Sequence, residues 1–523
     1  MMMIFFRASR ICRRLFASAL SFVSFLSSGS HAARSINFAR SAFPPSAPPA
    51  SDADSPHHPR HPHPRTHAVT LTRDTKDTLM VTDCGAESIA FMKVYGVLPA
   101  AAGFIALYSK MAAVLENNKS LLFYATAAPF FIFFLLFDKL IYPNKEALQP
   151  SLESVVATLG SSGVVSKIVA NWTSALYYVV SELYSSVSIG VLFWGYANSV
   201  IKIEEAGRFY PLFGQMSSLG PIAAGQYVVH YASKVGTFQE SLDRLTASII
   251  FSGIMICCFH AASEKLIASR EVAGGGSSSS AAAAAKAKSK SKPKMGMLES
   301  FKFLSSSPYL RLLAALVVGY GLSINFTEII WKSLVKKLYP SALEYQHFMG
   351  TFSSAVGVTT FFVIFLGGNV IKHLGWKVGA LATPTIMSVL ALPFFSCLLL
   401  GGVENTTSLK IAVMIGTAQS LLTKATKYAL FDPTTQMAYI PLDEESKVKG
   451  KAAIDVLGSR LGKSGGSLIQ QVLVFAFGNI VDAGWAVAAI FYSVLFVWMN
   501  SASKLSIMFR ELSDAGPSGK KAK

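Results

Sequence analysis

Long apolar runs constrain this chain more than any other feature of its sequence. A helix needs about 20 apolar residues to cross the hydrocarbon core of a bilayer, and several stretches approach or exceed that length. They lie at residues 88–108, 120–142, 165–197, 209–232, 244–262, 309–331, 347–371, 376–401, 409–431, 452–477 and 480–500. Only 15% of the residues are charged, whereas soluble proteins average about 25%. The sequence therefore predicts an all-α integral membrane protein embedded in a lipid bilayer.

The net charge of +18 raises the question of nucleic-acid binding. Part of the excess lies in a Lys-rich stretch at 274–295 and in the C-terminal tail, and such loops favour the cytoplasm-like face of a membrane. These basic runs lack the folded, aromatic-rich surroundings of a nucleic-acid surface, so no nucleic-acid partner is expected. The five cysteines form no CxxC pair, which argues against a disulfide framework or a metal site. No cofactor is predicted.

Composition divides the chain into five segments. We predict a targeting and disordered segment at 1–70, an N-terminal transmembrane half at 71–265, a basic flexible linker at 266–300, a C-terminal transmembrane half at 301–505 and a basic disordered tail at 506–523. Residues 1–14 are basic and carry no acid, which is typical of an address for an organelle or the secretory route. The string at 41–45, SAFPP, is similar to the junction of bipartite plastid presequences, while a generic signal peptide remains the alternative.

The apolar runs fall unevenly about the linker, with one more after it than before it. Transporters are commonly built from two repeated halves with the binding site between them. Residues 205–220 can be aligned with 449–464, since both have an early basic residue, a central apolar–Gly pair and an end rich in small residues. The division and the repeat together indicate a six-plus-six protein whose first span is missing.

Four charged residues fall within or beside the predicted spans, namely Lys93, Glu182, Glu328 and Lys463. Each costs about 2.5–3.5 kcal/mol at a helix centre, so such residues usually serve a solute. Two lysines facing a cavity suit an anion, and two glutamates can hold those lysines in the empty state or couple binding to movement. The alternative is that some of them, Lys93 first, lie at the interface and extend toward water.

Two other charged features have simpler interpretations. The stretch 458–464, GSRLGKS, resembles a phosphate loop, but that motif needs four residues between its glycines and this one has three. An ATP-hydrolysing enzyme is therefore not predicted. The dense charge clusters at 73–77 and 443–447, taken alone, are expected to be solvated.

Four stretches carry a family resemblance. They are TRDTKDTLMVT at 72–82, the segment at 191–214 that begins VLFWGYANSV, the segment at 299–340 that contains SINFTEIIWKSLVKKLYP, and the segment at 427–471 that contains FDPTTQMAYIPLDEESKVKGKAAIDVLGSRLGKSGGSLIQQ. In these stretches the chain resembles the plastid and intracellular-bacterial ATP/ADP translocases, the nucleotide transporter family of TLC type. The resemblance extends over about residues 71–500.

The resemblance implies a twelve-helix transporter with a major-facilitator-like arrangement of two halves, and we expect the protein to be a monomer. The resemblance also implies exchange of ATP for ADP across a membrane without hydrolysis, with phosphate as a further candidate substrate, and a plastid envelope location. By local motif, the charged residues of the family's transport path correspond to Lys93, Glu182, Glu328 and Lys463. Secondary candidates are Arg73, Lys76, Asn198, Arg208, Lys332, Lys427, Asp432, Lys449, Lys451 and Asp455.

One departure from the family pattern concerns the residues before Arg73. Family members have a hydrophobic helix there, whereas this chain has HPHPRTHAVTL, which is too polar to be expected to span. The sequence leaves open a misplaced exon boundary or a lost helix. Two other functions therefore stay open: a proton-coupled nucleotide importer, and a nucleotide-binding membrane protein that does not transport.

Overall fold

The computed structural model describes residues 63–160, 163–200, 213–273, 297–443, 446–447, 449–451, 453–454 and 461–514. Within these ranges every regular element is helical and no strand occurs. Eight of the described helical segments are long and apolar enough to cross a membrane by length and composition. The prediction of an all-α architecture is confirmed for the described part of the chain.

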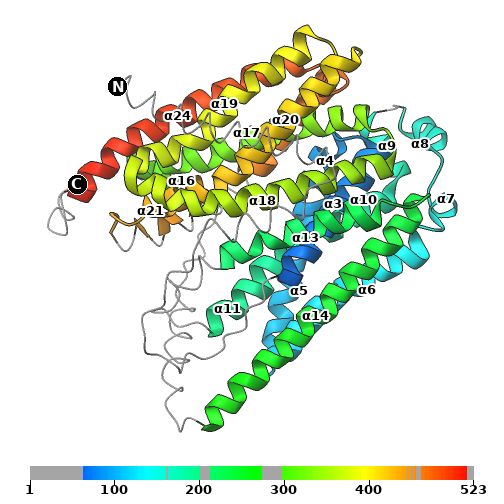
Figure 1. Cartoon of the computed structure of the whole chain (residues 1–523), viewed down its shortest axis with the longest axis horizontal. Helices are drawn as coiled ribbons and strands as arrows, with labels where there is room; N and C mark the ends of the chain where they lie inside the picture. The colour runs from blue at the N-terminus through cyan, green and yellow to red at the C-terminus, as the bar shows by residue number, and fades with distance from the viewer. Residues whose placement is uncertain are drawn as a thin grey trace, which may run out of the picture. The chain divides into compact units, whose positions relative to one another are not determined.

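The elements before the linker form the N-terminal set (blue to green in Figure 1). They are α3 (His63–Cys84), α4 (Ser88–Phe91), η1 (Met92–Val97), α5 (Leu98–Val114), α6 (Lys119–Leu136), η2 (Phe137–Ile141), α7 (Lys145–Leu148), α8 (Leu152–Leu159), α9 (Val164–Ala170), α10 (Trp172–Ser186), η3 (Val187–Phe193), α11 (Trp194–Val200), α13 (Leu219–Tyr227), η4 (Val228–Ala232) and α14 (Phe238–Ala273). Several of these are consecutive turns of one span, since α4, η1 and α5 together make the span Ser88–Val114.

The elements after the linker form the C-terminal set (yellow-green to red in Figure 1). They are α16 (Met297–Ser306), α17 (Pro308–Leu338), α18 (Ala342–Leu374), α19 (Trp376–Leu400), α20 (Thr406–Thr426), η5 (Lys427–Phe431), α21 (Asp432–Met437), η6 (Leu461–Gly465), α23 (Gly466–Phe477) and α24 (Gly484–Asp514). Within this set α17 packs against both α20 and α24, and α19 packs against the same two helices.

The RDTKD motif lies inside helix α3, which also contains most of the residues before the motif that were predicted to be too polar to span. Helix α3 has 22 residues, about 33 Å of helix, and it is not among the eight segments that are apolar enough to cross a membrane. It packs against α10, α13 and α14 of its own set and against α18 of the other. Protein therefore surrounds α3 where lipid would surround an outer helix, and Ala68, Leu71 and Leu79 are buried.

Hydroxyl groups of α3 explain how a polar helix can be buried. Thr72 donates to the Ala68 carbonyl at 3.0 Å, and Thr75 donates to the Leu71 carbonyl at 2.8 Å. A hydroxyl that bonds to its own helix one turn back needs no water. These side chains add polarity to the sequence without leaving unsatisfied groups, so hydropathy underestimates the capacity of this segment to lie inside a membrane protein.

The two sets meet most closely where α13 runs along α18. A β-carbon on Gly225 of α13 would collide with the carbonyl oxygen of Gly350 in α18 and would lie 2.6 Å from the backbone nitrogen of Ser354. Small residues allow helices to approach this closely. Gln226 adds a bond across the same crossing, because its Nε2 donates to the Ser354 hydroxyl at 2.7 Å.

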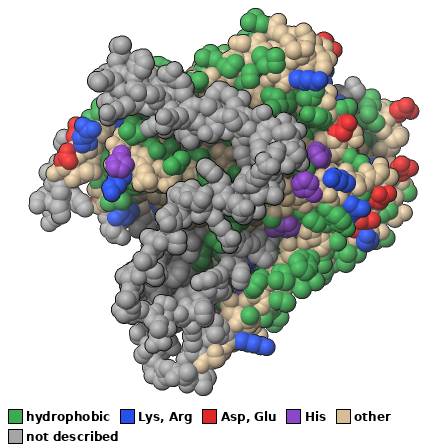
Figure 2. All heavy atoms as spheres, in the orientation of Figure 1, with side chains coloured by type: hydrophobic (Ala, Val, Ile, Leu, Met, Phe, Trp, Pro, Cys, Tyr) green, Lys and Arg blue, Asp and Glu red, His purple; other side chains and the backbone are tan. Residues whose placement is uncertain are grey.

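The outward faces of the spans are apolar. In the face drawn in Figure 2, hydrophobic side chains follow α6 and α14. Exposed apolar residues of these spans include Ile132 of α6, Leu140 of η2, and Phe251 and Ile254 of α14. Exposed apolar side chains of this density are typical of a surface that contacts lipid.

Some predicted boundaries differ from the observed helices. Helix α14 continues to Ala273 and α24 to Asp514, beyond the predicted ends of the two halves at 265 and 505, and α3 begins inside the predicted segment 1–70. The predicted run 409–431 corresponds to α20 and η5, which is not among the eight spans. Residues 1–62 and 274–296 lie outside the described residues, as do the predictions made for them.

Candidate functional site

Buried charges connect the two sets of helices. We call the following six residues the charge chain, because neighbouring members alternate in sign: Glu182, Lys76, Asp77, Lys332, Glu328 and Lys424. The first three lie on α10 and α3, and the last three on α17 and α20. Within the described structure, the link from α3 to α17 is the step of the chain that crosses between the sets.

On the N-terminal side, α3 presents Lys76 and Asp77 to the interior. The Lys76 ammonium lies 2.7 Å from Asp77 Oδ1 and 3.9 Å from Glu182 Oε2. It also lies 4.1 Å from the centre of the Tyr178 ring, a distance suited to cation–π attraction. Two carboxylates and one aromatic face therefore stabilise a lysine that is almost completely buried.

On the C-terminal side, α17 presents Lys332 and Glu328 one turn apart. Lys332 Nζ lies 2.9 Å from Asp77 Oδ2 and 3.4 Å from Glu328 Oε1. The same Glu328 oxygen lies 3.4 Å from Lys424 Nζ on α20. Glu328 is therefore shared between two lysines, only one of which also reaches the N-terminal set.

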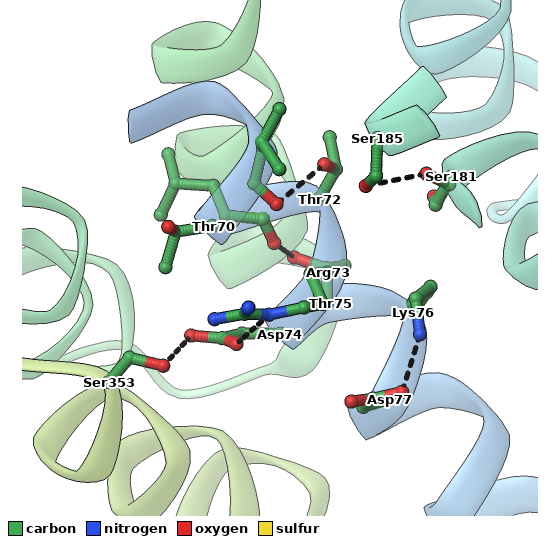
Figure 3. Close-up of polar contacts among 12 residues, drawn as sticks. Thr70, Thr72, Arg73, Asp74, Thr75, Lys76, Asp77, Ser181, Ser185 and Ser353 are labelled. Carbon is green, nitrogen blue, oxygen red and sulfur yellow. Dashed lines mark hydrogen bonds and ion pairs between the residues drawn. The ribbon is translucent and has the colours of Figure 1, made fainter. Parts of the chain in front are cut away.

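The cluster at 73–77 is not a solvated loop, which corrects that interpretation. Side chains of Asp74, Lys76 and Asp77 are 6%, 4% and 7% exposed, and only Arg73, at 44%, is largely accessible. Asp74 accepts a bond from the Ser353 hydroxyl of α18 at 2.5 Å, with Arg73 Nε 3.6 Å from its other oxygen. Figure 3 shows Arg73 and Asp74 on the side of α3 that faces Ser353, with Lys76 and Asp77 further along the helix. The cluster thus joins both sets of helices.

Lys93 lies in η1 and meets a neutral partner. Its Nζ donates to Asn325 Oδ1 of α17 at 2.6 Å. Among the described residues no carboxylate lies within 4.0 Å of this ammonium. Lys93 thus differs from the three lysines of the charge chain, because its described hydrogen-bond partner is an amide and not a carboxylate.

Asn325 also contacts the segment that carries Lys463. Its Nδ2 donates to the Gly462 carbonyl at 3.1 Å and to the Gly321 carbonyl at 2.8 Å. At this crossing η6 approaches α17 so closely that a β-carbon on Gly321 would lie 2.8 Å from the Gly462 α-carbon. One amide thus holds the Lys93 side chain and the backbone beside Lys463. The side chain of Lys463 itself lies outside the described residues.

Two glutamine side chains reinforce this junction. Gln470 Nε2 donates to the Asn325 carbonyl at 2.7 Å, and Gln471 Nε2 donates to the Ala90 carbonyl at 3.0 Å. Both glutamines are buried on α23, and Ala90 belongs to the N-terminal set. Asn325, which bonds Lys93, Gly321 and Gly462, and the two glutamines, which each add one bond, connect α4, η1, α17, η6 and α23. Buried networks of this kind fix helix positions.

The remaining candidates lie in other environments. Lys427 pairs with Asp432 at 2.6 Å and lies 4.4 Å from the centre of the Tyr428 ring. Lys451 is exposed and donates to Gln436 Oε1 at 2.8 Å, and no contact in the described ranges joins it to the charge chain. Four others are placed less fully. Lys449 is half-buried, Asn198 lies in α11 with its side chain undescribed, and Arg208 and Asp455 lie outside the described residues.

Sequence reasoning missed three polar groups of this region: Asp77, Asn325 and Lys424. Asp77 was noticed only as part of a cluster expected to be solvated. Lys424 lies inside the predicted run 409–431, so the criterion that selected Lys93 would have selected it too. Asn325 carries no charge, and no signal in a single sequence marks it.

The geometry defines a class of protein before any comparison. Buried charges at the contact between two sets of spanning helices are expensive and are found on the paths of charged solutes. A lysine at the same contact, bonded to an amide with no described carboxylate within 4.0 Å, indicates an anionic solute. These features define a multi-pass membrane transporter.

The sequence matches the family described as TLC ATP/ADP transporter over residues 66–509. ADP,ATP carrier protein 1 of Chlamydia muridarum is 43% identical over 463 residues, which cover 85% of this chain and 86% of that protein. ADP,ATP carrier protein 2, chloroplastic, of Arabidopsis thaliana is 39% identical, and the match covers 85% of this chain and 72% of that protein. ADP,ATP carrier protein 1 of Rickettsia bellii is 33% identical, and the match covers 84% of this chain and 90% of that protein. The chain belongs to the TLC ATP/ADP transporter family, which is a family of carriers and not of enzymes.

Solved structures of other transporters align over most of the chain at low identity. The xylose transporter XylE from E. coli, in an inward open conformation, gives a TM-score of 0.46 at 11% identity, with 85% of this chain and 98% of that chain covered. The nucleoside transporter NupG gives a TM-score of 0.44 at 10% identity, and the alignment covers 86% of this chain and 97% of that chain.

Proposed function

We propose that this protein is a membrane antiporter that exchanges ATP for ADP by alternating access, without hydrolysing either nucleotide. The observation that carries the proposal is Lys93, a lysine at the contact between the two sets of helices whose described neighbours include no carboxylate within 4.0 Å. A buried charge of this kind favours binding of an anion that neutralises it. The relatives named as ADP,ATP carriers support a nucleotide as that anion.

In the proposed mechanism, Lys93 and Lys463 bind the phosphates from opposite sets of helices. Asn325 holds the two lysine-bearing segments η1 and η6 next to each other in the empty carrier. Glu182 and Glu328 balance the other lysines through the charge chain. Without nucleotide, separating the two sets exposes charges that have lost their partners, which disfavours crossing of the empty carrier. A bound polyphosphate compensates them, and exchange then becomes obligatory.

Replacing Lys93 or Lys463 by alanine is expected to lower exchange by about 10- to 150-fold. The estimate corresponds to loss of one hydrogen bond to a charged group, about 1.5–3 kcal/mol. The measurement is uptake of labelled ATP into liposomes that contain ADP and the reconstituted full chain. Lys110→Ala is the matched control, because Lys110 is exposed on α5 of the same span as Lys93. Unchanged uptake by Lys93→Ala at equal incorporation would contradict the proposal.

The same liposomes distinguish the two other functions. Uptake into vesicles without internal nucleotide, abolished by an uncoupler, would identify proton-coupled import. Nucleotide binding without flux would identify a protein that does not transport. Stimulation of ADP uptake by phosphate, added inside or outside the vesicles, would identify phosphate as a third substrate. Light scattering of the purified protein tests the proposed monomeric state.

We further propose that the protein acts in a plastid envelope, with residues 1–62, which precede α3, as the address. Plant relatives named chloroplastic and the basic, acid-free start of the chain support this. A fluorescent protein fused behind residues 1–62 is expected to enter plastids of an algal or plant cell. The matched control replaces the arginines of residues 1–14 by glutamine and is expected to stay in the cytosol. Fluorescence of the unaltered fusion in the endoplasmic reticulum would overturn the assignment.

A further inference from the structure

Two lysines share one carboxylate oxygen in the C-terminal set, but their surroundings differ. Lys332 Nζ and Lys424 Nζ each lie 3.4 Å from Glu328 Oε1. Lys332 is 6% exposed and has a second, closer carboxylate in Asp77 at 2.9 Å. Lys424 is 23% exposed, and within the ranges that the structure covers Glu328 is the only carboxylate that lies within 4.0 Å of it. Lys332 is therefore fixed between two helices, whereas one long ion pair holds Lys424.

Both ends of the charge chain are partly accessible. Glu182 at one end is 29% exposed, and Glu328 and Lys424 at the other end are 23% exposed, whereas the groups between them are buried. Lys424 is therefore the accessible lysine of the chain. The Glu328–Lys424 separation of 3.4 Å exceeds the roughly 2.7–2.9 Å of a strong charge-assisted bond. Phe352 lies under the Lys424 ammonium at 5.0 Å, which favours a cation at this position without neutralising it.

We propose that Lys424 is a further binding residue for the phosphates of the transported nucleotide, and that Glu328 is the internal anion that occupies Lys424 while the carrier is empty. This inference rests on the proposed antiport function. The incoming polyphosphate carries several negative charges against the single charge of Glu328, so it displaces the carboxylate from the accessible lysine. Glu328 then keeps its bond to Lys332, and no buried charge is left without a partner.

The position of Glu328 explains how this displacement would reach both sets of helices. Glu328 interacts electrostatically with Lys93 of η1 as well as with Lys332 and Lys424. A polyphosphate that replaces the carboxylate would therefore lie between a lysine of the N-terminal set and a lysine of the C-terminal set. When the product leaves, Glu328 returns to Lys424. The site is thus occupied by an anion in both states.

Exchange kinetics of variants test the binding role. Lys424→Met is expected to raise KM for ATP and for ADP about tenfold, with the turnover rate at saturation changed much less. Lys424→Arg keeps the charge and is expected to restore most of the affinity. Lys410→Met is the matched control, because Lys410 is exposed on the same helix, and it is expected to behave like the unaltered protein. An unchanged KM in Lys424→Met overturns the binding role of Lys424. The proposed antiport function is tested separately, by whether the unaltered protein exchanges ATP for ADP.

A double-mutant cycle tests the role of Glu328 as competing anion. Stabilisation of the purified full chain against heat by inorganic tripolyphosphate measures binding without transport and without a base. Glu328→Gln is expected to tighten tripolyphosphate binding where Lys424 is present, and to have no such effect in the Lys424→Met background. Equal effects in both backgrounds would show that the two groups act independently and would overturn the inference.

The binding assay also separates the inference from the proposed function. If the unaltered protein shows no exchange but binds tripolyphosphate through Lys424, the antiport function fails and the binding role stands. If Lys424→Met does not fold, the double variant Glu328→Gln/Lys424→Met is used in its place, because it leaves no glutamate at position 328 without its lysine. Its tripolyphosphate binding is then compared with that of Glu328→Gln. Equal tripolyphosphate binding by those two variants would overturn the inference.

Discussion

Replacing Asp77 by asparagine is expected to lower both the stability of the chain and its exchange rate. Asp77 is the carboxylate that joins buried cations of the two sets of helices, with Lys76 at 2.7 Å and Lys332 at 2.9 Å. Removing one partner of a buried ion pair costs about 3–5 kcal/mol, because the remaining charge stays buried without compensation. The expected results are a lower melting temperature of the purified protein and an exchange rate reduced at least tenfold.

A second substitution distinguishes loss of stability from loss of function. In Asp77→Asn/Lys332→Gln both charges disappear, and the remaining members of the charge chain keep partners, since Lys76 retains Glu182 and Glu328 retains Lys424. Replacing a whole buried pair by neutral groups is often nearly neutral for stability. The double variant is therefore expected to recover most of the melting temperature. It is expected to exchange slowly still, because the ion pair that must break and re-form between the sets is absent.

The matched control is an ion pair at the end of α17, the helix that carries Lys332, the partner of Asp77. Lys337 pairs with Glu404, and both side chains are largely exposed. Exposed pairs contribute about 0–1 kcal/mol, so Lys337→Gln is expected to leave stability and exchange almost unchanged. An Asp77→Asn variant that matched Lys337→Gln in both measurements would show that the buried connection does not hold the two sets together.

Spanning helices could be predicted from the sequence wherever lipid is the neighbour. The runs 120–142 and 376–401 correspond closely to the observed spans Lys119–Ile141 and Trp376–Leu400. Their outer faces must be apolar because no water is available to polar groups in the bilayer core. That requirement is local, so a window of one sequence contains the information needed to find these helices.

Helix α3 could not be predicted by the same criterion, because its neighbours are other helices. Hydropathy measures the cost of moving a residue from water into lipid, whereas α3 is packed against α10, α13, α14 and α18. Several of its polar groups bond to its own carbonyls or to residues from the other set, such as Ser353 and Lys332. The Lys332–Asp77 partners are 255 positions apart in the chain, and a single sequence does not show such pairings.

The candidate site was predicted to the extent that charge marks it. Lys93 and Glu328 were selected because a charge in an apolar run is costly, and the structure brings both to the contact between the sets. The partner of Lys93 is a neutral amide, Asn325, whose importance comes from what it touches. The residue type alone predicts a polar interior position and nothing about which lysine it holds.

Substituting Gly225 by alanine is expected to reduce exchange strongly although it adds only one methyl group. The added β-carbon would collide with backbone atoms of Gly350 and Ser354 in α18, and backbone atoms cannot rotate away as a flexible side chain can. Overpacking of this kind costs about 1–3 kcal/mol. Because α13 and α18 belong to different sets, the clash is confined to the conformation in which they lie together. The substitution therefore penalises that conformation and leaves each set intact.

Liposome exchange and thermal stability, measured together, test this prediction. Gly103→Ala is the matched control, since Gly103 also lies in an N-terminal helix but a β-carbon there meets nothing within 4 Å. Alanine is favoured over glycine by about 0.5–1 kcal/mol inside a helix, so the control is expected to keep both stability and exchange. Gly225→Ala is expected to fold, to lose stability by a few degrees and to exchange at least tenfold more slowly. Exchange equal to that of Gly103→Ala would mean that the close approach of α13 and α18 is not part of the transport cycle.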